Sequence, residues 1–425
     1  MMQLLRPEVV ASASGGLLEM YDFTIYAFLG PILSASFFPR DDPGSALILT
    51  FGIFAIGYLA RPIGGLIYAQ FGDTIGRKKT LIVSILGMAV PTLLMGMLPT
   101  YQHLGLAAPM LLTAVRLLQG LAVGGDLPGA TVFVAEHAER SRRGLDCGLV
   151  FLGVNLGLVL ASLVSSLCLA LLPHDALTAW GWRLPFFLGV VIAMVGSYGR
   201  SHLQETPAFV AELEHSNLSQ IPLLIAVQHY RKQLVAGCGV IWLFSILVLL
   251  VLTFMPTYIP QVTHMPLQHV LLINTLGILL LAVLLPVFGH LSDRYSRKTW
   301  LLGSCVALIV ATYPMYQLLL TGNVAVVVMA WAALCILAAA FMGGAPCFLV
   351  ELFDTQVRYT GFAFSYNVSF ALFGGTAPLV ATLLMKEEHL KAAPGLYIVV
   401  AAVMALLSVV STPSRRTLSV GSELR

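Results

Sequence analysis

The sequence predicts an all-α polytopic membrane protein with twelve transmembrane helices in two pseudo-symmetric six-helix bundles. Three observations lead to this prediction. The chain of 425 residues is 58% hydrophobic and only 10% charged, whereas a soluble protein carries about 25% charged residues. Its apolar segments are long enough to cross a bilayer, which takes roughly 20 helical residues. Features of the first half also recur at equivalent places in the second half. The net charge of +3 is too small to indicate a nucleic-acid partner.

The apolar segments form two sets of six, separated by a polar stretch. The first set covers residues 9–38, 46–71, 79–99, 109–137, 145–172 and 184–202. The second set covers residues 233–259, 268–291, 299–320, 323–352, 361–385 and 394–412. We therefore predict an N-terminal bundle over residues 1–203, a cytoplasmic linker over 204–231 and a C-terminal bundle over 232–425. The linker is too polar to cross the membrane, and we expect it to be partly helical on the membrane surface.

Loop charges predict the orientation in the membrane. If the spans alternate, most basic loop residues fall on one side: Arg77, Lys78, Lys79, Arg140, Arg142, Arg143, Arg231, Lys232, Arg294, Arg297, Lys298, Arg358, Arg415 and Arg416. The opposite loops hold Arg40, Arg183, Lys386 and Lys391. Because positively charged loops stay in the cytoplasm, both termini and the linker are expected to be cytoplasmic.

Two charge patterns recur in both halves. An acid precedes two basic residues by four and five positions in Gly72–Lys79 and again in Ser292–Thr299, and a glutamate precedes an arginine by seven positions at the ends of spans four and ten. This repetition indicates duplication of a six-helix unit. We expect the charges to pair and hold cytoplasmic helix ends together, although they could instead serve only to set topology. The candidate gating residues are Asp73, Arg77, Lys78, Glu136, Arg143, Asp293, Arg294, Arg297, Glu351 and Arg358.

The first apolar segment contains two acids. Glu19 and Asp22 are three residues apart and Tyr26 follows four later, so all three share one helical face. A charged group at the bilayer centre costs about 2.5–3.5 kcal/mol on insertion scales, which favours a functional role. We predict that this face carries a proton and helps to bind a solute; a polar contact between helices is the alternative.

Further charged residues lie within spans two and four. Arg61 needs a carboxylate partner or an anionic ligand, so it is either part of a permanent ion pair or involved in gating or ligand binding. Arg116 and Gln119 share a face and could contact substrate or pack between helices. Burial favours the protonated form of an acid and a nearby arginine favours the ionised form. Asp22 and Glu19 are therefore the leading candidates for proton coupling, with Asp126 third.

The second half has little buried charge, so aromatic and amide groups are its candidates for substrate recognition. These are Trp242, Tyr258, Trp331, Tyr366 and Asn367, each of which could instead pack in the core. Histidines and cysteines show no metal-ligand spacing, and no nucleophile–base constellation or phosphate-binding glycine loop is present. We predict that the protein is not an enzyme and uses no cofactor other than the coupling proton.

Several motifs resemble the major facilitator superfamily. The loop Gly72–Lys79 resembles its signature between helices two and three, and the segment beginning Arg116-Leu-Leu-Gln119-Gly120 resembles its helix-four signature. Four pieces resemble the metabolite:proton symporter family, which includes importers of proline/betaine, α-ketoglutarate, citrate and shikimate: Glu19-Met-Tyr-Asp22-Phe23, Arg61-Pro62-Ile63-Gly64-Gly65, the stretch 200–209 and the stretch 351–361. The resemblance implies the major facilitator fold and a bacterial inner-membrane location.

The prediction for function is proton-coupled import of a small polar organic metabolite, a carboxylate or a zwitterion, by alternating access. The intramembrane arginines favour a substrate that carries a carboxylate. Proton-driven efflux of hydrophobic compounds and solute sensing without transport are the alternatives. The expected partners are the metabolite and the lipid bilayer, and the protein is expected to be a monomer.

Overall fold

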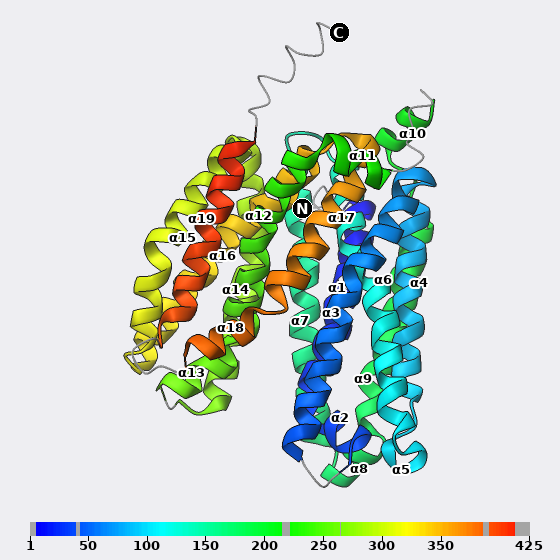
Figure 1. Cartoon of the computed structure of the whole chain (residues 1–425), viewed down its shortest axis with the longest axis vertical. Coiled ribbons are helices and arrows are strands. Elements are labelled where there is room, and N and C mark those ends of the chain that lie inside the picture. The colour runs from blue at the N-terminus through cyan, green and yellow to red at the C-terminus, as the bar shows by residue number, and fades with distance from the viewer. Residues whose placement is uncertain (1–5, 40–42, 215–221, 264, 386–390, 413–425) are drawn as a thin grey trace, which may run out of the picture. The chain divides into compact units, whose positions relative to one another are not determined.

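The computed structural model describes residues 6–39, 43–214, 222–263, 265–385 and 391–412 (Figure 1). The predicted loop charges Arg40, Lys386, Arg415 and Arg416 lie outside these residues. Every regular element within the described ranges is helical. The chain divides into two units. The first contains residues 1–137 and 149–222, and the second contains residues 138–148 and 223–425.

The first unit is built mainly from six long helical segments. Its elements are α1 (Pro7–Phe28), α2 (Gly30–Phe37), α3 (Pro43–Thr74), α4 (Arg77–Met97), α5 (Tyr101–Leu104), α6 (Ala107–His137), α7 (Arg143–Leu171), α8 (His174–Ala179), η2 (Gly181–Arg183), α9 (Leu184–Ser201) and α10 (Pro207–Glu214). The first residues of α7, up to Gly148, belong to the second unit.

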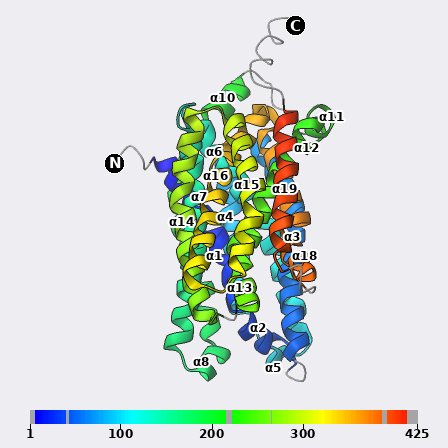
Figure 2. The same ribbon diagram turned by 90° about the vertical axis from the view of Figure 1, so that its left-hand side faces the viewer.

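The second unit follows a similar plan with more interruptions. Its elements are α11 (Pro222–His229), α12 (Arg231–Ile246), η3 (Leu247–Thr253), α13 (Met255–Thr263), α14 (Leu267–Arg294), α15 (Arg297–Leu319), α16 (Val324–Leu352), η4 (Thr355–Val357), α17 (Arg358–Ser369), η5 (Phe370–Gly374), α18 (Ala377–Leu384) and α19 (Ala393–Ser411). The long helices α14, α15, α16 and α19 run along a common direction in both views (Figure 2).

Ten helices among the described residues are long and apolar enough to cross a membrane. The first and eleventh predicted spans are present as broken helices. The first is interrupted at Leu29, where Gly30-Pro31 begins α2, because proline has no N–H to continue the ladder. The eleventh changes from α17 to the π-helical turn η5 and restarts as α18. The seventh is also interrupted, by the π-helical η3 between α12 and α13.

Glycines allow α3 and α6 to pack closely in the first unit. A Cβ on Gly120 would lie 2.1 Å from the carbonyl oxygen of Gly57, and one on Gly124 would lie 2.2 Å from that of Arg61. This spacing of small residues four apart is typical of close helix–helix contacts in membranes. The close approach of the two helices brings the part of α3 that carries Arg61 against α6.

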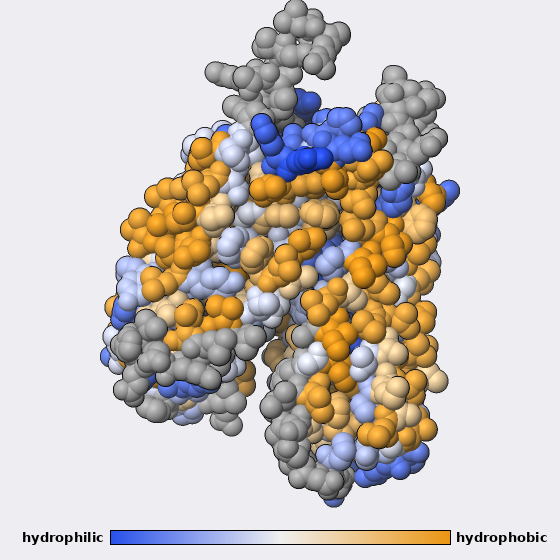
Figure 3. Space-filling model, in the orientation of Figure 1, coloured by the Kyte–Doolittle hydropathy of each residue, from blue (hydrophilic) through white to orange (hydrophobic). Residues whose placement is uncertain are grey.

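Helices α1 and α4 link this pair to α9. Helix α1 packs on α6 and α9, and α4 packs on the same two helices. Large apolar side chains such as Leu59, Val83 and Met110 are exposed on the outside. The space-filling view shows hydrophobic residues along the sides of the helices and hydrophilic residues gathered near their ends (Figure 3), which is the distribution that a bilayer requires.

Candidate functional site

The first buried ion pair joins Glu19 of α1 to Arg61 of α3. An Nη2 of Arg61 donates to Oε1 of Glu19 over 2.7 Å, and both side chains are at most 3% exposed. The guanidinium also lies 5.5 Å from the ring centroids of Phe23 and Tyr58. Arg61 therefore has the carboxylate partner that its burial requires. An ion pair was one of the two alternatives that the sequence suggested for this residue.

Asp22 lies one turn further along α1 and contacts a different set of groups. Thr92 on α4 donates a hydrogen bond to Oδ2 of Asp22, and Gln119 on α6 donates to the Thr92 hydroxyl over 3.3 Å. The other carboxylate oxygen of Asp22, Oδ1, is buried and makes no hydrogen bond within the described part of the chain. Glu19 and Asp22 thus share a helical face but belong to separate polar clusters.

Arg116 completes the cluster around Asp22. Its Nη1 donates to Oε1 of Gln119 over 2.5 Å, and its guanidinium carbon lies 3.6 Å from the ring centroid of Tyr26. The Tyr26 hydroxyl in turn donates to the Thr50 carbonyl over 3.0 Å. The structure therefore brings together four residues that the sequence singled out from two distant segments: Asp22, Tyr26, Arg116 and Gln119.

Asp126 has an arginine partner that the sequence reasoning missed. Arg200, in the last turn of α9, donates from Nη1 and Nη2 to the two carboxylate oxygens of Asp126 over 2.5 and 3.1 Å. Ser84 donates to the same carboxylate over 2.7 Å, and the Arg200 side chain also donates to the carbonyl oxygens of Ala11 and Leu81. The sequence offered one signal for a buried role of Arg200, which is that this charged residue lies inside the sixth predicted apolar segment.

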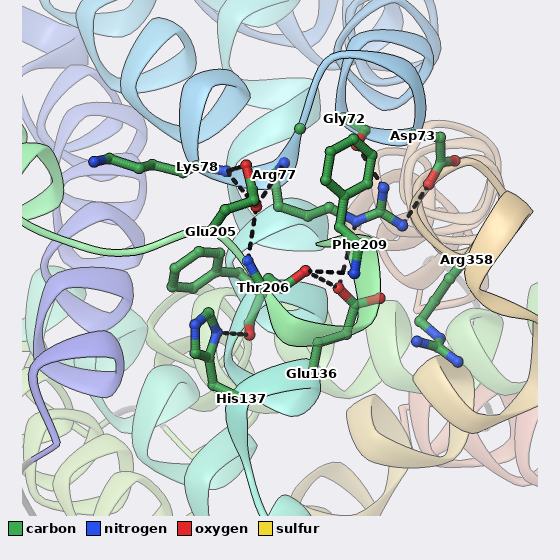
Figure 4. A network of polar contacts seen from close by, with 12 residues as sticks. Gly72, Asp73, Arg77, Lys78, Glu136, His137, Glu205, Thr206, Phe209 and Arg358 are labelled. Carbon is green, nitrogen blue, oxygen red and sulfur yellow. Dashed lines mark hydrogen bonds and ion pairs between the residues drawn. The ribbon is translucent and has the colours of Figure 1, made fainter. Parts of the chain in front are cut away.

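A separate polar network lies where α3 meets α4, and Figure 4 shows its side chains converging on Arg77. Arg77 pairs with Asp73 over 3.0 Å and with Glu136 over 3.4 Å, and it donates to the Gly72 carbonyl over 2.6 Å. Thr206 also donates to Glu136, over 2.7 Å. Three of the predicted gating charges, Asp73, Arg77 and Glu136, are thereby brought into one cluster.

The start of the linker supplies further groups to this network. The carboxylate of Glu205 accepts from the backbone N–H groups of Arg77 and Lys78 over 3.1–3.2 Å, at the first residues of α4. The Phe209 ring covers the Arg77 guanidinium, with its centroid 4.9 Å from the guanidinium carbon. Sequence reasoning did not select Glu205, Thr206 or Phe209 as site residues, because nothing local shows that the linker folds back onto this loop.

The equivalent cluster in the second unit is centred on Arg297. It pairs with Asp293 over 2.8 Å and with Glu351 over 3.0 Å, while Arg143 lies 3.9 Å from Glu351. Arg358 donates to the carbonyl oxygens of Val350 and Phe353. The remaining gating candidate, Arg294, is exposed. A state-dependent role for these charges stays a prediction.

The aromatic candidates of the second unit have packing partners. The ring of Trp242 stacks on that of Phe373 with the ring centroids 4.1 Å apart, and the centroids of the Tyr366 and Phe370 rings are 4.5 Å apart. Both candidates therefore pack on the turn η5. Tyr258 donates to the Lys391 carbonyl, and its ring contacts Tyr316. Asn367 donates to the Ala363 carbonyl one turn earlier in α17. Trp331 is buried in α16. Their role in substrate binding remains a prediction.

The described residues contain no group of three or more histidine, cysteine, aspartate or glutamate side chains arranged to hold a metal ion. The buried sites described above contain carboxylates, guanidinium groups, hydroxyls and amides. Such groups can bind a polar solute and transfer a proton.

The chain was compared with known proteins. The family model of the Major Facilitator Superfamily matches residues 13–377 and 238–423. The glycine betaine/proline/ectoine/pipecolic acid transporter OusA of Dickeya dadantii is 33% identical over 95% of this chain and 82% of its own. The proline/betaine transporter of Escherichia coli is 32% identical over the same shares. The citrate-proton symporter of Salmonella typhi is 31% identical over 94% of this chain and 92% of its own.

Solved structures agree on the fold. The proton:xylose symporter XylE superposes with a TM-score of 0.77 at 15% identity, covering 95% of this chain and 94% of that one. The human organic anion transporter MFSD10 superposes with a TM-score of 0.65 at 16% identity, covering 96% of this chain and 100% of that one. These findings confirm the predicted helical fold and the expectation of a transporter rather than an enzyme. The chain belongs to the major facilitator superfamily.

Proposed function

We propose that this transporter imports a small polar metabolite together with protons and that Asp22 carries the coupling proton. One observation supports the choice of Asp22 among the three candidate acids. Glu19 is paired with Arg61 and Asp126 is paired with Arg200. Asp22 forms no ion pair among the described residues, and its hydrogen bond comes from the neutral hydroxyl of Thr92.

The electrostatic reason is the cost of changing the charge. Protonating Glu19 or Asp126 would leave a buried guanidinium without its counter-ion, which is strongly unfavourable in a low-dielectric interior. Protonating Asp22 removes a buried charge and leaves the Thr92 hydroxyl free to turn to the Met88 carbonyl, which is 2.9 Å away. Asp22 can therefore alternate between its charged and neutral forms with the least disturbance of its neighbours.

The relatives support the substrate class and the location. Their names specify glycine betaine, proline and citrate, which all carry a carboxylate. One further relative, 34% identical, is called an inner membrane metabolite transport protein of Escherichia coli. We place the chain in a bacterial inner membrane with both termini in the cytoplasm. The citrate-proton symporter among the relatives favours symport over the alternatives of efflux and solute sensing.

Proteoliposomes with an imposed pH gradient test this proposal. Radiolabelled glycine betaine, L-proline and citrate serve as substrates. We expect Asp22→Asn to abolish gradient-driven accumulation and to retain exchange of internal for external substrate, because the asparagine cannot release a proton. Asp175→Asn, which makes the same change at an exposed residue of α8, is the matched control. Accumulation at the wild-type level by Asp22→Asn would assign the proton to another group.

A further inference from the structure

The guanidinium of Arg116 is buried, and Asp22 interacts with it electrostatically only from beyond ion-pair distance. The Arg116 side chain is 1% exposed, and it forms no ion pair with any residue that the structure describes. Nη1 is used by Gln119, whereas Nε and Nη2 make no hydrogen bond. An arginine remains charged at every physiological pH, so burial of these donors is unfavourable unless they acquire a partner during function.

The other two buried arginines of the first unit's membrane core differ from Arg116. Arg61 is paired with Glu19 over 2.7 Å. Arg200 is paired with Asp126 over 2.5 Å and also donates to two backbone carbonyl groups. The ring of Tyr26 compensates one face of Arg116 by a cation–π contact at 3.6 Å, but a contact to the face leaves the N–H donors along the edge unsatisfied.

The unsatisfied atoms are the two that a carboxylate needs. The Nε–H and one N–H of Nη2 point in parallel from the same edge of the planar guanidinium, and this edge matches the two oxygens of a carboxylate. The bond from Nη1 to Gln119, which in turn contacts Thr92, and the ring of Tyr26 hold the guanidinium in one orientation. The edge is therefore preorganised before any ligand binds.

We propose that the Nε–Nη2 edge of Arg116 is the binding site for the carboxylate of the transported metabolite. The proposal rests on the proposed transport function and deepens it, because it identifies the substrates as small molecules with a carboxylate that can be bound bidentately. Arg61, which the sequence suggested for this role, keeps Glu19 as its partner. Arg116 acts as a specificity-determining residue that excludes solutes without an anionic group, since these cannot pair with its charge.

Equilibrium binding to the purified full-length protein, without any gradient, tests the assignment. The probes are glycine betaine, L-proline and citrate, with choline and L-prolinol as analogues that replace the carboxylate of the first two by a hydroxymethyl group. We expect the wild type to bind at least one carboxylate and to bind its analogue more weakly. Arg116→Gln should raise the dissociation constant of that carboxylate at least about 30-fold and leave that of the analogue unchanged. Arg116→Lys, which keeps the charge but loses the parallel donors, should also weaken carboxylate binding.

Two controls accompany these variants. Arg231→Gln removes an exposed arginine and should leave carboxylate binding unchanged. The melting temperature of ligand-free Arg116→Gln should fall less than that of Arg61→Gln, because Arg116 forms no direct ion pair whereas Arg61→Gln leaves the Glu19 carboxylate without its partner.

Three results would overturn the assignment. They are wild-type carboxylate affinity in Arg116→Gln, equal wild-type affinity for the carboxylates and their analogues, and a wild type that binds none of the three carboxylates. Failure of proton coupling has a different signature. If carboxylate binding requires Arg116 but a pH gradient drives no accumulation, the carboxylate site stands and the proposal of proton symport fails.

Discussion

At the scale of single residues, the first unit sorts its buried charges into two classes. Glu19 with Arg61 and Asp126 with Arg200 are ion pairs, and the second of these is bidentate. Asp22 and Arg116 are charged groups whose remaining polar atoms have no partner among the described residues. Pairs of the first kind join neighbouring helices, whereas groups of the second kind are the ones that we propose for binding a proton and a ligand.

The Asp126–Arg200 pair is predicted to contribute to stability rather than to proton coupling. Removing one partner of a buried pair costs about 3–5 kcal/mol, so Arg200→Met should strongly lower the melting temperature in detergent. The double variant Arg200→Met with Asp126→Leu should recover much of the loss, because no unpaired charge remains. An Arg200→Met protein as stable as the wild type would show that the pair contributes little.

At the scale of elements, acids satisfy the exposed backbone donors of two helix N-termini. Glu205 accepts from the first N–H groups of α4 in the first unit, and Asp293 accepts from those of Gly144 and Leu145 at the start of α7 in the second. A carboxylate at this position also interacts favourably with the helix dipole. The end of the linker is held as well, by the hydrogen bond of 2.5 Å from Tyr230 to Asp354. Burial, together with this bond and the nearby carboxylate charge, raises the pKa of Tyr230.

Docking of the linker on α4 is predicted to depend on Glu205 and Gly76. Gly76 has a φ of +125°, and a Cβ there would lie 2.4 Å from the Glu205 carboxylate. Glu205→Ala should therefore increase amide hydrogen exchange over residues 202–210 and at the start of α4, and Gly76→Ala should do the same. Gln204→Ala, at the exposed neighbouring position, is the control. Unchanged exchange in Glu205→Ala would mean that the linker is held by its other contacts.

At the scale of the whole molecule, basic loops and apolar spans determine how the chain sits in a bilayer. The loop around Ser141 contains Arg140, Arg142 and Arg143, whereas the short helix α5 around Gln102 contains no arginine or lysine. Positively charged loops are retained in the cytoplasm. The two loops are therefore expected on opposite sides of the membrane.

This orientation can be tested with two single-cysteine variants in a background without the six native cysteines. Gln102→Cys should react with a membrane-impermeant maleimide in intact cells, because its loop is expected to face outward. Ser141→Cys should react only after permeabilisation. Both positions are exposed in the structure, so a difference in labelling reports the side of the membrane rather than burial. The reverse pattern would place the termini outside.

Most of the membrane-spanning helices could be predicted from local sequence patterns, and the differences are breaks within single helices. Ten of the predicted spans appear as long apolar helices among the described residues. The break at Leu29 coincides with Gly30-Pro31, a signal that the prediction of one segment over residues 9–38 did not use. The π-helical turns η3 and η5 carry no comparable signal, because Leu247–Thr253 is a uniformly apolar stretch apart from its last residue.

The sequence by itself determined that this protein is a helical membrane transporter with charges inside its first bundle. Apolar length, loop charge and the spacing of residues along one helix are local properties, and they are sufficient to predict membrane helices and buried charges. Transport was implied by the resemblance of several short motifs to the major facilitator superfamily. Only the tertiary structure decided which charges neutralise one another. Asp126 and Arg200 are 74 positions apart and Glu19 and Arg61 are 42 apart. Their pairing depends on how packed helices rotate and cross, and that same packing leaves Asp22 and Arg116 in one cluster without a direct ion pair among the described residues.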